Sequence, residues 1–217
     1  MMSRQERMLC PRFVISCIVV LLLQIEFGPA PEGASLFVNG VTFSDRLGGF
    51  ILEKVSGEGS LNDPFVLVEK MMDSNGGTLS FRVQPEFGNR IDSQHVIGFA
   101  IIKVIENATD LPWTSFDLEL QSQLGVPSGD PDGLSFGQGS NAGRPFAADG
   151  FDKVSIVDQP YDRVEFDHGR ISIGGHVTLR IVISESMSLG EVYLVQRPGK
   201  PVAEAPLTRR TIRLASR

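Results

Sequence analysis

The strongest constraint on this chain is a repeated alternation between short apolar runs and turn residues, with almost no helical periodicity. Glycine, proline, asparagine and aspartate bound these runs, which is typical of strands separated by tight turns. The expected strands cover residues 36–43, 50–55, 64–71, 78–84, 96–105, 116–124, 134–136, 153–157, 163–166, 171–173, 177–183 and 191–196. This spacing predicts one all-β domain over residues 35–197, folded as an antiparallel β-sandwich or jelly roll.

Two features inside this domain carry more specific expectations. Residues 96–105 form a long apolar run, which indicates a central strand buried on both faces. The Asn75-Gly76 dipeptide lies between two of the runs, and Asn-Gly is the strongest short hairpin signal. We therefore expect residues 64–71 and 78–84 to be the two strands of one hairpin.

Residues 1–34 have the pattern of a secretory signal peptide. Three arginines precede an apolar run at residues 13–23, which Gln24 and Glu26 end. A bilayer span needs about 20 apolar residues, so this run is too short to cross a membrane, and a basic start before a short apolar run is typical of a cleaved leader. An uncleaved anchor or a buried strand is the alternative. We expect a secreted or extracytoplasmic protein, in the periplasm, at the cell surface or outside the cell, with no transmembrane helix in the mature chain.

Cysteine usage and charge exclude several function classes. The two cysteines, Cys10 and Cys17, both lie in the predicted leader, so the mature domain has no disulfide, no cysteine-ligated zinc and no thiol nucleophile. The net charge of -6 without a basic face makes nucleic acid an unfavourable partner. From Pro198 the chain becomes rich in proline and arginine, which predicts a disordered basic tail over residues 198–217.

Three short segments are similar to a known group of proteins. They are the sequence Trp-Thr-Ser-Phe-Asp-Leu-Glu-Leu at 113–120, Gly-Leu-Ser-Phe at 133–136, and Gly174-Gly175 before a strand. Together they resemble the extracytoplasmic domains of exported bacterial proteins of the PEP-CTERM type, over residues 95–197. The resemblance implies an extracytoplasmic β-sandwich and no catalytic residues. The sorting tail of that family, with its Pro-Glu-Pro motif and closing helix, is not in this sequence.

Catalytic motifs are missing from the sequence. It contains neither a Gly-x-Ser-x-Gly nucleophile elbow nor a phosphate-binding loop. The carboxylates Asp117 and Glu119 are expected to face opposite sides of one strand, which would prevent them from forming an acid/base pair. We therefore assign no catalytic residues.

Two groups of residues could bind a metal. Asp130 and Asp132 flank a proline in a glycine-rich segment, and carboxylates around a tight turn are ligands that calcium prefers. The alternative is an ordinary aspartate-rich turn, because aspartate suits turns for backbone reasons. His168 and His176 could share a metal with Asp167 or Asp162, although isolated histidines are the simpler interpretation.

Two further features bear on ligands. Asn107 begins an Asn-Ala-Thr glycosylation sequon. Trp113, Phe116 and Phe136 could form an exposed aromatic platform for sugars, or could belong to the core.

These observations predict an exported, non-enzymatic β-sandwich that serves adhesion, envelope structure or ligand binding. A carbohydrate or a protein is the expected ligand class, and nucleic acid is not expected. One alternative is a secreted enzyme, for example one that acts on carbohydrates. The other is a calcium-dependent binding module in which Asp130 and Asp132 hold the metal. Calcium is the single cofactor candidate.

Overall fold

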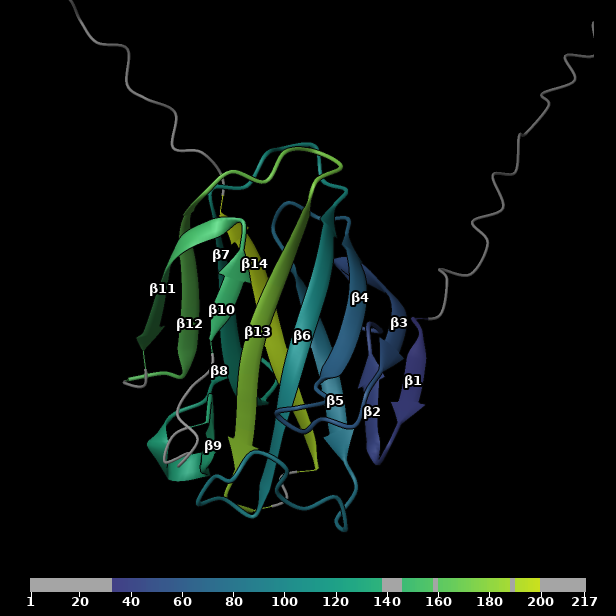
Figure 1. Ribbon diagram of the computed structural model, residues 1–217, viewed down its shortest axis with the longest axis vertical. Helices are drawn as coiled ribbons and strands as arrows, with labels where there is room; N and C mark the ends of the chain where they lie inside the picture. The colour runs from purple at the N-terminus through teal and green to yellow at the C-terminus, as the bar shows by residue number, and fades with distance from the viewer. Residues whose placement is uncertain (1–32, 138–145, 158–159, 188–189, 200–217) are drawn as a thin grey trace, which may run out of the picture. The chain divides into compact units, whose positions relative to one another are not determined.

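The computed structural model describes residues 33–137, 146–157, 160–187 and 190–199. These residues form two β-sheets packed face to face, and the part described contains no α-helix and one short 3-10 turn at Asp130–Asp132 (Figure 1). The predicted all-β sandwich is therefore confirmed. No helix among the described residues could span a membrane. The predicted leader, apart from its last two residues, and the tail beyond residue 199 lie outside the described residues.

One sheet has eight strands and runs in the order β1-β2-β5-β14-β7-β12-β11, with β8 paired to β7. Its strands are β1 (Ser35–Val38), β2 (Val41–Ser44), β5 (Gly77–Val83), β7 (Ser115–Gln123), β8 (Val126–Pro127), β11 (Phe151–Val157), β12 (Arg163–Gly169) and β14 (Glu191–Gly199).

The other sheet has six strands in the order β10-β13-β6-β4-β3, with β9 paired to β13. Its strands are β3 (Phe50–Ser56), β4 (Phe65–Met71), β6 (Ile97–Asn107), β9 (Leu134–Ser135), β10 (Ala147–Asp149) and β13 (His176–Glu185). β4 and β6 pair in parallel, while the other paired strands of both sheets are antiparallel. β6 is the middle strand of this sheet, as its apolar sequence predicts.

Phenylalanine rings join the two sheets across the core. Phe81 of β5 packs edge-on against Phe99 of β6, with ring centroids 5.5 Å apart. Phe99 also packs edge-on against Phe65 at 6.0 Å and against Phe87 at 5.9 Å. All four rings are buried, so burial of large aromatic side chains supplies much of the cohesion in a domain that has no disulfide.

The expected single strand at residues 36–43 is in fact a hairpin. Asn39 and Gly40 take positive φ angles of 46° and 94°, and β1 pairs with β2 on either side of them. Asn-Gly supplies the two left-handed residues that a two-residue hairpin turn requires. The prediction missed this turn because the residues around it form one nearly continuous apolar run.

The expected hairpin at Asn75-Gly76 is wrong. β4 belongs to the six-stranded sheet and β5 to the eight-stranded sheet, so this turn carries the chain from one layer to the other. Close packing explains the glycine, because a Cβ on Gly76 would lie 1.9 Å from the backbone oxygen of Gln196 on β14.

Two other boundaries differ from the expectation. Residues 171–173 form no strand, and Ile171 makes a single bridge to Trp113. β14 continues past residue 197, because Pro198 pairs with Phe116 and Gly199 with Ser115, and Pro198 is buried. The sheet therefore includes two residues that the sequence assigned to the tail.

Candidate functional site

The outward face of the eight-stranded sheet carries a continuous set of polar side chains. Strand register places Arg197 of β14 beside Asp117 of β7, and Asp117 beside Glu165 of β12. One step along the strands, Glu119 lies beside Arg163. The intervening side chains of β7, such as Leu118, are buried in the core. This alternation makes one face of the sheet apolar and the other charged.

Asp117 and Glu119 lie on the same face, so the prediction that they face opposite sides is wrong. Residues two apart in a strand always share a face, because the side-chain period is two. Both carboxylates lie within the influence of Arg197 and Arg163. The strand period alone, correctly applied, would have found this carboxylate pair.

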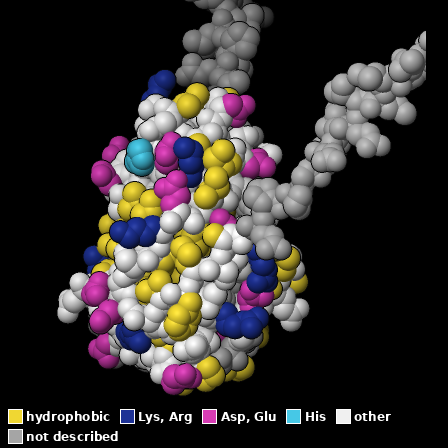
Figure 2. Space-filling model, turned by 90° about the vertical axis from the view of Figure 1, so that its right-hand side faces the viewer, with side chains coloured by type: hydrophobic (Ala, Val, Ile, Leu, Met, Phe, Trp, Pro, Cys, Tyr) yellow, Lys and Arg dark blue, Asp and Glu magenta, His cyan; other side chains and the backbone are white. Residues whose placement is uncertain are grey.

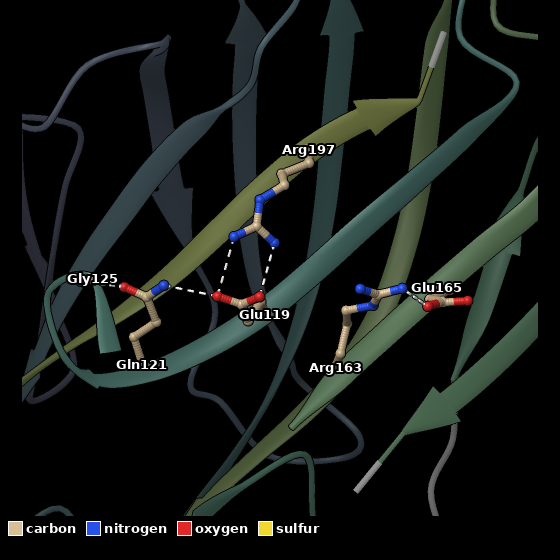
Figure 3. Close-up of polar contacts among 6 residues, drawn as sticks. All are labelled: Glu119, Gln121, Gly125, Arg163, Glu165 and Arg197. Carbon is tan, nitrogen blue, oxygen red and sulfur yellow. Dashed lines mark hydrogen bonds and ion pairs between the residues drawn. The ribbon is translucent and has the colours of Figure 1, made fainter. Parts of the chain in front are cut away.

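Glu119 is held by two neighbours (Figure 3). Arg197 donates to both of its carboxylate oxygens, at 3.0 and 3.1 Å, in a bidentate pair. Gln121 Nε2 donates to Glu119 Oε1 at 2.8 Å, and Gln121 Oε1 accepts from the backbone NH of Gly125 at 2.7 Å. Planar pairs of this kind fix geometry better than single ionic contacts, so Arg197 and Gln121 together hold the Glu119 carboxylate in place.

Burial and hydrogen bonds move the two carboxyl pKa values in opposite directions. Desolvation is the largest influence on both groups and works to raise their pKa. The pKa of Asp117 is raised, because the opposing arginine charges do not offset burial. The pKa of Glu119 is lowered, because hydrogen bonds from Arg197 and Gln121 outweigh burial.

A hollow of about 250 Å³ lies beside this network. It is lined by Glu119, Val157, Pro160, Tyr161, Arg163 and Glu165. Arg163 is paired with Glu165 on its own strand (Figure 3), and Tyr161 is 50% exposed at the rim. The hollow thus combines guanidinium and carboxylate groups with an accessible aromatic ring.

A second hollow of about 200 Å³ lies on the same sheet, over β1, β2, β5 and β14. Hydroxyl and charged side chains line it: Ser35, Thr42, Ser44, Arg46, Ser80, Arg82 and Glu191. Arg46 Nη2 donates to Glu191 Oε2 at 2.6 Å, and this hydrogen bond is the main reason why the pKa of Glu191 is lowered. No sequence motif identifies this site, because its residues come from four strands and from the loop after β2.

Tyr193 lies between the two hollows. It pairs in register with Ser80 on β5 and with Gln121 on β7, and its hydroxyl is 3.4 Å from Glu191 Oε2. A row of polar side chains therefore crosses the sheet from one hollow to the other. We call the two hollows with Tyr193 the polar face.

The predicted calcium residues lie in the turn between β8 and β9. Asp132 Oδ1 accepts hydrogen bonds from Ser128 Oγ at 2.9 Å and from the Leu134 NH at 3.0 Å. Ser128 Oγ also lies 3.5 Å from Asp162 Oδ2, so two carboxylates approach one hydroxyl. The backbone of Asp130 belongs to the 3-10 turn, and its side chain lies outside what the structure describes.

The histidines are not brought together. His168 lies on β12 of the eight-stranded sheet and His176 on β13 of the six-stranded sheet, and both are exposed. Among the side chains described, no three histidine, cysteine, aspartate or glutamate residues gather around a position for a metal ion.

The sequon asparagine is a structural residue. Asn107 is fully buried, and its Nδ2 lies within hydrogen-bonding distance of the carbonyl oxygens of Leu111 at 2.9 Å, Ser172 at 3.2 Å and Ile171 at 3.3 Å. Its Oδ1 accepts from Thr109 Oγ1 at 2.6 Å and from the Thr109 NH at 3.1 Å. A glycan on Nδ2 does not fit this site. In this protein the Asn-Ala-Thr motif is therefore structural, and Asn107 holds a loop closed.

The proposed aromatic platform is wrong, and the core interpretation is confirmed. Trp113 is 1% exposed, and Phe116 and Phe136 are fully buried. Trp113 Nε1 donates to Thr109 Oγ1 at 3.1 Å, which satisfies the one polar atom of the indole ring.

On one side of the domain, charges of both signs are interspersed (Figure 2). Figure 2 views the side of the domain on which the edge strands β1 and β3 lie, and it shows acidic and basic side chains mixed with hydrophobic ones. That view contains no broad basic patch of the kind that binds a phosphate backbone.

Comparisons with protein-family models, with curated proteins and with solved structures found no match to this chain.

Proposed function

We propose that this chain is an exported binding module, and that its polar face binds a carbohydrate. The observation that carries the proposal is the arrangement of two polar hollows on one sheet face with Tyr193 between them. The predicted leader supports export. The proposed role is non-enzymatic and lies at the cell surface or outside the cell, in adhesion or envelope structure.

The chemistry of the face matches that of a sugar. A sugar ring carries adjacent hydroxyls around its edge and an apolar surface formed by its C–H bonds. Planar guanidinium and carboxylate groups, such as Arg163 and Glu165, can each contact two adjacent hydroxyls. An exposed ring such as Tyr161 can pack on the apolar surface. Because ion pairs already hold the side chains of the polar face in place, less conformational entropy is lost on binding.

Retardation in polysaccharide-containing native gels tests this proposal. The full chain should be retarded by at least one of three soluble polymers: a neutral β-glucan, arabinoxylan or alginate. Tyr161→Ala and Arg163→Ala should each weaken binding about tenfold, which corresponds to about 1.4 kcal/mol. His176→Ala, an exposed substitution on the opposite sheet, is the control and should bind like wild type.

Two results would contradict this function. If both variants were retarded as strongly as wild type, the polar face would not be the binding site. Release of new reducing ends from the polymers, lost in Asp117→Asn, would instead favour the secreted-enzyme alternative. Asp117 is the residue to change because a carboxyl with a raised pKa beside one with a lowered pKa is the arrangement that acid/base catalysis needs.

Calcium binding at Asp130 and Asp132 is the second candidate. The approach of the Asp132 and Asp162 carboxylates to Ser128 Oγ favours it, because calcium takes carboxylate, hydroxyl and carbonyl oxygens together. A cation would also remove the repulsion between neighbouring carboxylates.

Thermal unfolding with millimolar calcium and with a chelator tests this second candidate. Calcium at a hundredfold excess over its dissociation constant should stabilise the domain by about 2.7 kcal/mol. The double variant Asp130→Asn with Asp132→Asn should lose this shift. Asparagine at 132 keeps an acceptor for the Leu134 NH, so the turn itself should persist. Equal melting temperatures with calcium and with chelator would mean that these residues form the turn and do not bind calcium.

A further inference from the structure

Three polar side chains lie inside the apolar core. Lys103 on β6 and Gln196 on β14 are fully buried, and Glu69 on β4 is 1% exposed. Lys103 Nζ donates to Glu69 Oε1. The other Glu69 oxygen and both side-chain amide atoms of Gln196 have no hydrogen-bond partner within the part of the chain that the structure describes. Such groups are costly to bury, so their presence in this core calls for an explanation.

The contact between Phe81 and Phe99 shows which positions of the two sheets face each other across the core. Phe81 of the eight-stranded sheet packs against Phe99 of the six-stranded sheet, and Val192 of β14 pairs with Phe81. Lys103 lies four positions after Phe99 on β6, and Gln196 lies four positions after Val192 on β14.

From the position of this contact, β6 and β14 both run toward the same end of the domain. Gly77 of β5 is the partner of Gln196, and a Cβ on Gly77 would lie 2.8 Å from the ring of Phe50. Phe50 pairs with Met71 at the end of β4, and β4 runs parallel to β6. Gln196 therefore lies toward the end of the sandwich to which β4 and β6 run.

The three buried polar residues therefore lie toward the same end of the core. Glu69 of β4 pairs in register with Ile105, two positions after Lys103 on β6, and its carboxylate accepts a hydrogen bond from Lys103 Nζ. The amine and the carboxylate come from the six-stranded sheet and the amide from the eight-stranded sheet. An amine, a carboxylate and an amide are the groups needed to make a new amide bond.

Burial also prepares the amine for reaction. Desolvation lowers the pKa of Lys103, against the opposing influence of Glu69. A lowered pKa increases the fraction of the neutral, nucleophilic amine. Glu69 is placed to receive the proton that the ammonium loses.

We propose that Lys103 and Gln196 form an intramolecular amide bond that joins the two sheets, with Glu69 as the proton carrier. Glu69 takes a proton from the Lys103 ammonium, and the neutral Nζ then attacks Cδ of Gln196. The bond between Cδ and Nζ forms and the bond between Cδ and Nε2 breaks. Glu69 delivers a proton to the departing NH2 group and takes the second proton from Nζ. Ammonia leaves with that proton as ammonium, Glu69 returns to its starting state, and no atom is oxidised or reduced.

Such a bond would suit this domain. From residue 18 onward the chain contains no cysteine, so no disulfide can link the sheets. A dry core keeps water away from the new amide, and a link between distant strands restricts the unfolded chain.

Mass spectrometry of the denatured full chain tests the proposal directly. The intact mass should lie about 17 Da below the mass of the same chain without the bond, because one ammonia is lost. Tryptic digestion should yield a branched peptide that joins the segments containing Lys103 and Gln196. Lys103→Met and Glu69→Gln should both restore the full mass, while Lys54→Met, an exposed substitution on β3, should leave the branched peptide intact.

The wild-type result is decisive even if a variant fails to fold. Separate, unmodified peptides for Lys103 and Gln196 in the wild-type digest would overturn the proposal. A loss of about 18 Da with Lys103 joined to Glu69 would also overturn it, since water would then have left and Gln196 would not be the partner.

Discussion

Replacing Asn107 by aspartate should lower the free energy of unfolding by about 4 kcal/mol at neutral pH. The substitution keeps the size and shape of the side chain but exchanges the Nδ2 donor for an oxygen. That oxygen would face the carbonyl groups of Leu111, Ile171 and Ser172, which Nδ2 faces in the wild type. The variant therefore loses favourable contacts and gains a buried charge among acceptors.

Chemical denaturation measures this loss, and the melting temperature should fall by about 10 °C. Gln84→Glu is the matched control, because it makes the same amide-to-carboxylate change at an exposed position. It should alter stability by less than about 0.5 kcal/mol. Equal effects of the two substitutions would contradict a structural role for Asn107.

The effect of pH on the Asn107→Asp variant gives a second, independent signature. Burial among carbonyl oxygens should raise the pKa of the new carboxyl above its unfolded value of about 3.9. The folded state then binds more protons than the unfolded state, so the deficit relative to wild type grows as pH rises above about 4 and shrinks below it. A deficit that does not change with pH would show that this carboxylate stays hydrated.

Replacing Phe99 by alanine should cost about 3–5 kcal/mol, because a large ring is lost from the centre of the core. Phe99 contacts Phe65, Phe81 and Phe87, and Phe81 belongs to the opposite sheet. Phe99→Leu should cost less, since leucine fills most of the cavity that alanine leaves.

Urea denaturation checks the second prediction, with Phe37→Ala as the control. Phe37 is 59% exposed on the edge strand β1, so its removal should change stability by less than about 0.5 kcal/mol. A cost below about 1 kcal/mol for Phe99→Ala would mean that the core can close around the missing ring.

Several properties of the fold could be predicted because they depend on local periodicity. The apolar run at 96–105 predicted a central strand, and β6 occupies that place. The same period of two places Asp117 and Glu119 on one face of β7, although our prediction applied it wrongly. An Asn-Gly turn was recognised at Asn75-Gly76, where it joins two sheets, and missed at Asn39-Gly40, where it makes a hairpin.

The polar face and the buried polar group could not be predicted from the chain alone. Arg46 and Glu191 are 145 residues apart in sequence and form one hydrogen bond. Lys103 lies in an apolar run without any motif around it. The parallel pairing of β4 with β6 and the packing of the two sheets bring Glu69 and Gln196 to the same end of the core. In the sequence, Asn107 is recognised only as part of a sequon. Its structural role depends on contacts with the loop at residues 171–172.

The sequence by itself determined that this chain forms strands, where most of them lie and which side chains of each strand are apolar. These properties follow from backbone geometry and solvent exposure within a few residues, so each segment carries its own information. The tertiary structure alone decided which strands are neighbours, which sheet each turn leads to, and which polar side chains meet. Those outcomes depend on contacts between residues far apart in the chain, where the burial of all strands together selects one pairing among many.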